Sequence, residues 1–301
     1  MNKIKSPRVT FNQLRTLEAV VRHRSVTQAA RELHLTQPTV SAQLQDLRNA
    51  LDADLFETVG RGIRPTASAQ LLRDTALDLF ARWQRFEEDL LGLQGLERGA
   101  LRIAGVTTTE YFIAQWLADY SASHPGIDIE LAVDNRDAVV NRLINDEIEI
   151  AVMMMPPAQL SLETMPVMHN QLVLIGNKDH PWATDKRLSR QSLNDQPLLM
   201  REHGSGTRLA TEAYLHEHGL QPRVRATLGS NEAIKHAVAA GLGLAVVSEH
   251  VLPKKPASEG LAVLNVAGFP LKRQWQLVWR KDRKLSLAAK TFIEEVGGRY
   301  G

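Results

Sequence analysis

The stretch LTQPTVS, residues 35–41, combines hydroxyls, an amide and a proline at the predicted start of a helix. Thr36 is a candidate N-cap, and Pro38 follows in the first turn, where its missing N–H would have had no intrahelical acceptor. The side opposite Val40 and Leu44 lacks the Glu and Lys that usually cover a solvated helix face. Amide and hydroxyl side chains can pair with base edges in the DNA major groove. Capping alone explains Thr36 and Pro38, but it does not explain the whole face.

A second set of polar residues lies where predicted strands are followed by helices, which is where open α/β sheets bind ligands. The four segments are Thr107–Glu110, Asn135–Asp137, Arg201–Arg208 and Gly229–Glu232. Hydroxyls and free N–H groups at helix starts form anion sites. If the segments meet at one cleft, they would hold a small carboxylate or phosphate ester.

Structural roles remain open for single residues of this set. Thr107 and Glu110 fit a capping box. Ser230 can simply cap a helix, and Asp137 can simply pair with Arg136.

Other tempting patterns carry no chemistry. The sequence has no cysteine, which excludes disulfides and thiolate metal sites. GLGLAV, residues 241–246, follows a helix and precedes a strand, the reverse of a dinucleotide-binding fold. His216 and His218 would lie roughly 200° apart on a helix, and GSG, residues 204–206, lacks a nucleophile-elbow frame. We expect no metal, no cofactor and no enzymatic activity.

Charge is unevenly distributed along the 301 residues. The chain has a net charge of +2, but residues 1–65 carry ten Lys or Arg against six acidic residues, a balance of +4. A basic segment on a balanced chain suggests a phosphate-backbone partner. The N-terminus has no apolar signal region, and no run of about 18 uncharged apolar residues occurs. The sequence therefore predicts a cytoplasmic protein without a membrane segment.

Three short helices are predicted before residue 52. Their candidate N-caps are Thr10, Ser25 and Thr36. In the third helix, Val40, Leu44, Leu47 and Leu51 form a narrow apolar stripe. Residues 55–66, LFETVGRGIRPT, predict a small hairpin around two glycines. Three helices followed by a basic hairpin are typical of a winged helix-turn-helix, whose third helix enters the major groove.

A long helix is predicted over residues 66–93. Its apolar seam repeats at spacings of 4 and 3 and comprises Leu72, Ala76, Leu79, Trp83, Phe86, Leu90 and Leu93. A helix between two domains cannot bury such a seam on itself, so we expect it to pair with a second chain. Packing against its own domain is the alternative.

The remainder alternates strands and helices. Predicted strands are 101–106, 127–133, 147–153, 172–177, 197–200, 223–228, 243–247 and 274–280. This order favours largely parallel sheets, and we expect two small α/β lobes rather than one large sheet. Met153–Met155 stand at a cleft-side strand end, which indicates either a less polar pocket or core filling.

The segment FNQLRTLEAVVRHRSVTQAARELHLTQPTVSAQLQDLRNALDADLFE closely resembles the N-terminal domain of LysR-type transcriptional regulators. The resemblance covers nearly the whole chain. It implies an α+β multidomain protein with an all-α winged helix-turn-helix (1–65), a linker and dimerisation helix (66–95) and an effector-binding domain (96–301). The last resembles two-lobed periplasmic solute-binding proteins, with lobe I at about 98–169 and 272–301 and lobe II at about 170–271.

The resemblance also assigns DNA-binding residues. It makes Gln37, Pro38 and Ser41 the base readers. Thr27, Thr36, Thr39, Gln43 and Arg61 would position the domain on phosphates. Many family members have Arg after the matching serine, whereas this chain has Ala42. That departure shifts base reading toward Gln37, Ser41 and Gln45.

The remaining implied contacts concern the effector and the partners. Predicted effector contacts are Thr107, Thr108, Thr109, Asn135, Arg136, Met153, Arg201, Ser205, Gly206, Thr207, Ser230 and Asn231. Predicted dimerisation residues are Leu72, Leu79, Trp83, Phe86 and Leu90. The family implies a dimer of dimers on an inverted-repeat promoter site, a small anionic metabolite as effector, and contact with RNA polymerase.

Two segments, REHGSGTR…GSNEAIKHAVAAGLGLAVVS and HPGIDIELAVDNRD, more narrowly resemble regulators of Calvin-cycle (RuBisCO) operons. Two other classes stay open on the residues alone. One is a solute-binding protein without a DNA role, which residues 1–65 argue against. The other is an enzyme with an attached DNA-binding domain, for which no titratable pair stands out.

Overall fold

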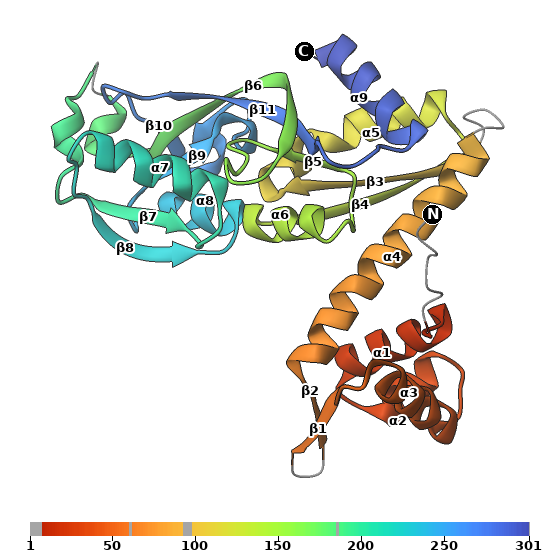
Figure 1. Ribbon diagram of the computed structural model, residues 1–301. Helices are drawn as coiled ribbons and strands as arrows, with labels where there is room; N and C mark the ends of the chain where they lie inside the picture. The colour runs from red at the N-terminus through yellow and green to blue at the C-terminus, as the bar shows by residue number, and fades with distance from the viewer. Residues whose placement is uncertain (1–7, 60–61, 93–97, 185–186, 301) are drawn as a thin grey trace. The chain divides into compact units, whose positions relative to one another are not determined.

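The computed structural model of the protein (Figure 1) describes residues 8–59, 62–92, 98–184 and 187–300. The chain forms two compact units, Met1–Phe86 and Glu87–Gly301. No helix among the described residues is long and apolar enough to cross a membrane.

The first unit contains the three predicted helices and the predicted hairpin. Its elements are α1 (Phe11–His23), α2 (Val26–Glu32), α3 (Gln37–Leu51), β1 (Phe56–Val59) and β2 (Gly62–Pro65), followed by α4 (Ala67–Gly92). Each predicted cap residue, Thr10, Ser25 and Thr36, accepts a backbone N–H through its hydroxyl at 3.3 Å. Thr10 also forms a capping box with Gln13. These bonds explain where the helices begin.

Buried aliphatic residues hold α3 against its neighbours. Val40 and Leu47 are fully buried, the first among alanines of α2 and the second beside Leu17 of α1. Leu51, at the end of the predicted stripe, is 41% exposed. The buried side of α3 thus points inward, and its start projects away from the core.

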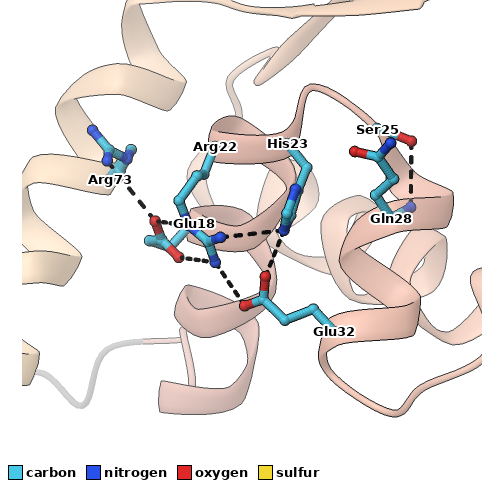
Figure 2. Close-up of polar contacts among 7 residues, drawn as sticks. All are labelled: Glu18, Arg22, His23, Ser25, Gln28, Glu32 and Arg73. Carbon is cyan, nitrogen blue, oxygen red and sulfur yellow. Dashed lines mark hydrogen bonds and ion pairs between the residues drawn. The ribbon is translucent and has the colours of Figure 1, made fainter.

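An ion-pair network connects α1, α2 and α4 (Figure 2). The Arg22 guanidinium lies between Glu18, at 3.1 Å, and Glu32, at 2.6 Å. His23 also contacts Glu32, and Arg73 of α4 reaches Glu18 at 3.8 Å. Hydrogen bonds from Arg22 and then His23 hold the pKa of Glu32 at about 2. The network ties the end of α1 to the end of α2.

The second unit is a mixed α/β structure. Its strands are β3 (Gly99–Val106), β4 (Ile127–Asp134), β5 (Ile150–Met153), β6 (Leu162–Asn177), β7 (Pro197–Arg201), β8 (Arg223–Leu228), β9 (Leu244–Ser248), β10 (Leu261–Val263) and β11 (Leu271–Arg280). Its α-helices are α5 (Ile113–Ser123), α6 (Arg136–Ile144), α7 (Gly206–Glu217), α8 (Asn231–Ala239) and α9 (Leu287–Tyr300). A 3-10 helix, η1 (Thr107–Tyr111), follows β3, and another, η4 (Glu249–Val251), follows β9.

Nine strands of the described residues pair in the order β4-β3-β5-β11-β6-β9-β7-β8, with β10 also on β6. We call the part built on β3–β5 with α5, α6 and α9 the first lobe. The part built on β7–β9 with α7 and α8 is the second lobe. Figure 1 shows α6 on the opposite side of β3–β5 from α5 and α9. Pairing is parallel within each lobe and antiparallel where β6 and β11 join them.

The sequence suggested two small lobes rather than one large sheet. In the structure the two lobes share one sheet, because β6 and β11 are paired from Leu162 to Leu172 and continue through both lobes. The prediction found only residues 172–177 of β6. The preceding part of β6 is mostly exposed or half-buried, with only Val167 and Asn170 buried. It also includes Pro166 and pairs across a register shift between Trp275 and Gln276. Strand β5 is shorter than predicted and begins at Ile150, after Asp146 turns with a positive φ of 57°.

Candidate DNA-binding face and ligand pocket

The start of α3 presents an exposed polar face. Gln37, Pro38, Thr39, Ser41 and Ala42 are all exposed, as is Gln45 one turn later. Thr36 and Thr39 share a hydroxyl hydrogen bond of 2.8 Å beside the cap. Amide, hydroxyl and small apolar groups on a protruding helix start can read base edges in the major groove. We call these residues, with Thr36, the α3 face.

The other predicted DNA contacts are placed differently. Thr27 is exposed in the first turn of α2. Gln43 is half-buried and accepts a hydrogen bond from Thr16 of α1, while Gln45 donates to Asn49 at 3.0 Å. Arg61 lies outside the described residues. Gln43 thus fixes α3 on α1 besides any role it has at a phosphate.

Basic side chains border this unit. In the hairpin, Arg64 pairs with Glu57 on the facing strand at 2.8 Å. Exposed arginines without an ion pair among the described residues before α4 are Arg8, Arg15, Arg24 and Arg31. The sequence analysis counted these four in the basic segment that suggested a phosphate-backbone partner, but it named none of them as an individual DNA contact.

One exposed side of α4 carries a row of large apolar residues. Leu79, Trp83, Phe86 and Leu90 are 43–52% exposed, although Trp83 contacts the rings of Phe11 and Phe86. By contrast, Ala76 is buried, and Leu72 packs beside Leu47 in the unit's own core. The predicted seam therefore divides. Its beginning belongs to this unit, its later part is open, and Leu93 lies outside the described residues.

In the second unit, a buried arginine connects the two lobes. Arg201, at the end of β7, is 3% exposed. It donates to Asn231 at the start of α8 at 2.5 Å and to Thr107 of η1 at 3.1 Å. Asn231 in turn donates to Thr108 at 3.3 Å. Thus three of the four predicted polar segments meet at one point, with Thr107 and Thr108 in the first lobe and Arg201 and Asn231 in the second.

The fourth segment meets the second lobe at the start of α6. The Asp137 N–H donates to the Gly204 carbonyl at 3.3 Å. Gly204 has a φ of 81°, and a Cβ there would overlap the Asp137 carboxylate, so this approach requires glycine. Beside it is a pocket of about 110 Å³, lined by Arg136, Asp137, His203, Gly204, Ser205, Arg208, Leu209 and Glu212. One water needs roughly 10–15 Å³, so the pocket suits a ligand of few atoms.

A second contact between the lobes involves Tyr111. Its hydroxyl donates to Glu232 at 2.5 Å, and Lys235, itself 5% exposed, bridges Glu232 and Glu259. Burial and, to a lesser extent, the hydrogen bond to Glu232 raise the pKa of Tyr111. The same hydrogen bond lowers the pKa of Glu232. Burial alone would lower the pKa of Lys235, but hydrogen bonds with Glu232 and Glu259 outweigh it and raise the pKa.

The remaining predicted effector contacts have mixed placements. Asn135 and Ser230 cap α6 and α8. Met153 is fully buried in the core, as is Thr109, whose hydroxyl has no hydrogen-bond partner among the described residues. Thr207 and Gly206 lie in the first turn of α7.

One structural expectation needs correction. The capping box at Thr107 and Glu110 is absent, because η1 starts after Val106 without a side-chain cap and Thr107 instead accepts from Arg201. Sequence reasoning also left Arg208 and His203 out of the predicted contacts, although both lie within the segment it singled out. The available signal was a second cation one turn after the helix start at Ser205.

These features define a class of protein: a DNA-binding regulator whose second unit holds a small-ligand site between two lobes. Residues 11–70 match the family described as bacterial regulatory helix-turn-helix protein, lysR family, and residues 94–300 match the LysR substrate binding domain. The chain belongs to the LysR family of transcriptional regulators.

Individual relatives support the assignment to this family. A RuBisCO operon transcriptional regulator of Acidithiobacillus ferrooxidans is 38% identical over 95% of this chain and 92% of its own. The regulatory domain of Synechocystis PCC6803 CcmR, solved in complex with 2-PG, is 38% identical, with a TM-score of 0.65 over 67% of this chain and 98% of that one. Full-length CbnR, solved with its target DNA, has a TM-score of 0.72 over 96% and 99% of the two chains at 21% identity, a likeness of fold.

Proposed function

We propose that this regulator reads an inverted-repeat promoter site through the α3 face, with Gln37, Pro38 and Ser41 on base edges. Thr27, Thr36, Thr39, Gln43, Gln45 and Arg61 are proposed to complete the interface. The observation that carries the proposal is the exposure of the whole α3 face at a capped helix start. Ala42 leaves the centre of that face uncharged, so base reading falls to amide and hydroxyl groups.

We further propose that a small anion in the pocket between α6 and α7 controls this activity. Support comes from two arginines and two helix starts at one pocket. The 2-PG bound by the CcmR domain, 2-phosphoglycolate, is a phosphorylated carboxylate of suitable size and charge. Similarity to RuBisCO operon regulators supports a role in carbon-fixation genes.

The assembly we propose is a dimer through the open side of α4, and a dimer of dimers on DNA. The two-fold axis of a dimer matches an inverted repeat. The domain boundaries 1–65, 66–95 and 96–301 belong to this proposal. So do contact with RNA polymerase, action in the cytoplasm and the absence of catalytic activity, since the relatives are named transcriptional regulators.

One mobility-shift experiment tests the function. The full-length protein should bind the promoter region next to its own gene at moderate salt, and 2-phosphoglycolate should alter the affinity or the mobility of the complex. Gln37→Ala and Ser41→Ala should each weaken binding roughly tenfold, because a lost base contact costs about 1–3 kcal/mol. Gln70→Ala, an exposed glutamine of α4, is the matched control. Binding that is unaffected by both α3 variants would contradict the proposed interface.

A further inference from the structure

The two arginines of the second lobe nearest the pocket make different contacts. The Arg201 side chain is 2% exposed, and the Glu202 carboxylate accepts from its Nε at 2.8 Å and its Nη2 at 2.9 Å. Its remaining recorded bonds run to Asn231 and Thr107. All three of its nitrogens already donate to these partners, so an anion could bind this buried guanidinium only by displacing one of them. Buried, already paired charges are costly to separate.

Arg208 can exchange its carboxylate partner for a ligand anion. Its Nε donates to Glu212 at 2.7 Å, and its Nη1 donates to the Arg201 carbonyl at 3.0 Å. Nη2 has no acceptor within the part of the chain that the structure describes. The Arg208 side chain is 13% exposed, whereas Glu212 is 49% exposed. A ligand anion can therefore replace Glu212, whose carboxylate returns to water.

Ser205 supplies an unused hydroxyl at the same place. The residue is 6% exposed and lines the pocket, yet it makes no side-chain cap bond, and its hydroxyl has no hydrogen bond among the described residues. The first N–H groups of α7 lack intrahelical acceptors. Because Ser205 lines the pocket and its hydroxyl has no hydrogen bond among the described residues, that hydroxyl is available to a ligand oxygen.

Arg136 approaches from the first lobe. Its side chain is 13% exposed, and its Nε donates to the Met155 carbonyl at 2.9 Å. A Cβ placed on Gly206 would lie 3.7 Å from Arg136 Cδ, so the arginine stem passes over the first turn of α7. Its ion-pair partner Asp137 is 62% exposed, so a ligand anion can replace this carboxylate as it can replace Glu212 at Arg208.

We propose that Arg208, with Ser205 and Arg136, is the anchor of the anionic ligand. Arg201, a predicted ligand contact, is instead a positioning residue that joins the lobes through Thr107 and Asn231. The assignment rests on the proposed anion response. Because Arg208 also binds the Arg201 carbonyl, a ligand on Arg208 lies one hydrogen bond from the contact between the lobes.

Thermal unfolding of the full-length protein in increasing inorganic phosphate or 2-phosphoglycolate tests the assignment. Arg208→Gln should unfold near the wild-type temperature without anion and need at least tenfold more of either anion for the same stabilisation. Arg201→Gln should unfold at a lower temperature without anion but keep its anion dependence within about threefold of wild type. Thr107→Val breaks the same link if Arg201→Gln fails to fold. The control, Arg225→Gln on β8, should match wild type in both respects.

The outcomes separate the two proposals. A wild-type protein that neither anion stabilises contradicts the proposed anion response and this assignment with it. A wild-type response that Arg208→Gln retains in full contradicts this assignment alone. Loss of the response in Arg201→Gln or Thr107→Val with Arg208→Gln unaffected would make Arg201 the anchor.

Discussion

Glu32 joins two helices of the DNA-binding unit through its carboxylate. It sits at the end of α2 and receives Arg22 and His23 from α1, which hold its pKa at about 2. A carboxylate whose pKa is lowered by folding stabilises the folded state above its unfolded pKa, about 4.5, and loses that contribution as the pH falls toward the folded pKa.

Glu32→Gln should therefore lower the unfolding temperature of the full-length protein at pH 7, by a small amount because the groups are exposed to solvent. The difference from wild type should shrink as the pH falls from about 4.5 toward 2, where the wild-type carboxylate takes up its proton. Calorimetry across this range measures it. Glu57→Gln, which removes the carboxylate of the hairpin ion pair with Arg64, is the control. A difference that stays constant with pH would contradict the role of the carboxylate.

At the scale of single residues, sequence reasoning identified the helix caps, whereas the ligand contacts that it named stay predictions. Thr10, Ser25 and Thr36 act over three residues of chain, so their types and spacing suffice. Arg201 and Arg208 are seven residues apart and both cationic. What distinguishes them is burial and the exposure of their carboxylate partners, which depends on segments distant in sequence.

Helix α4 shows the same limit at the scale of an element. The heptad spacing predicted its apolar side, but spacing cannot tell whether a second chain or the same unit covers it. The structure puts Ala76 in the unit's own core and leaves Leu79 43% exposed three residues later. Likewise β6 was half missed, because its first part is mostly exposed or half-buried and shows neither an apolar run nor a strict alternation.

We expect Leu79→Glu to weaken self-association at least tenfold, because a charge would have to be buried in the proposed interface. Sedimentation of the full-length protein over a range of concentrations measures the dimer constant. Gln84→Glu adds the same charge at another exposed position of α4 and should have little effect. An unchanged association of Leu79→Glu would place the dimer interface elsewhere.

Across the ligand-binding unit, the two lobes are held by contacts at separate points, and Tyr111 makes the outer one. Tyr111→Phe removes the hydrogen bond to Glu232 while keeping the ring. The unit should lose at most about 1 kcal/mol of stability. The loss is reduced because Glu232 is 55% exposed and can form a hydrogen bond with water instead. If ligand binding favours an arrangement in which the lobes lie close together, removing this contact favours one in which they lie further apart. The same variant should therefore bind the anion more weakly.

Denaturant unfolding with and without 2-phosphoglycolate measures both effects. Tyr120→Phe, whose hydroxyl bonds within the first lobe to the Ala288 carbonyl, is the matched control and should change stability without changing ligand affinity. Equal affinity in wild type and Tyr111→Phe would mean that this contact does not distinguish the two arrangements.

The chain crosses between the lobes only in strands β6 and β11 among the described residues, and this sets how the lobes can move. Two paired strands cannot pivot about one loose bond. Any rotation must be taken up within these strands as a change of twist, with the hydrogen bonds between them intact. Pro166 donates no N–H, and the register slips opposite it, so compliance concentrates beside Trp275. Ligand binding would then move the lobes by changing the twist of β6 and β11 rather than by a rigid-body rotation about a single hinge.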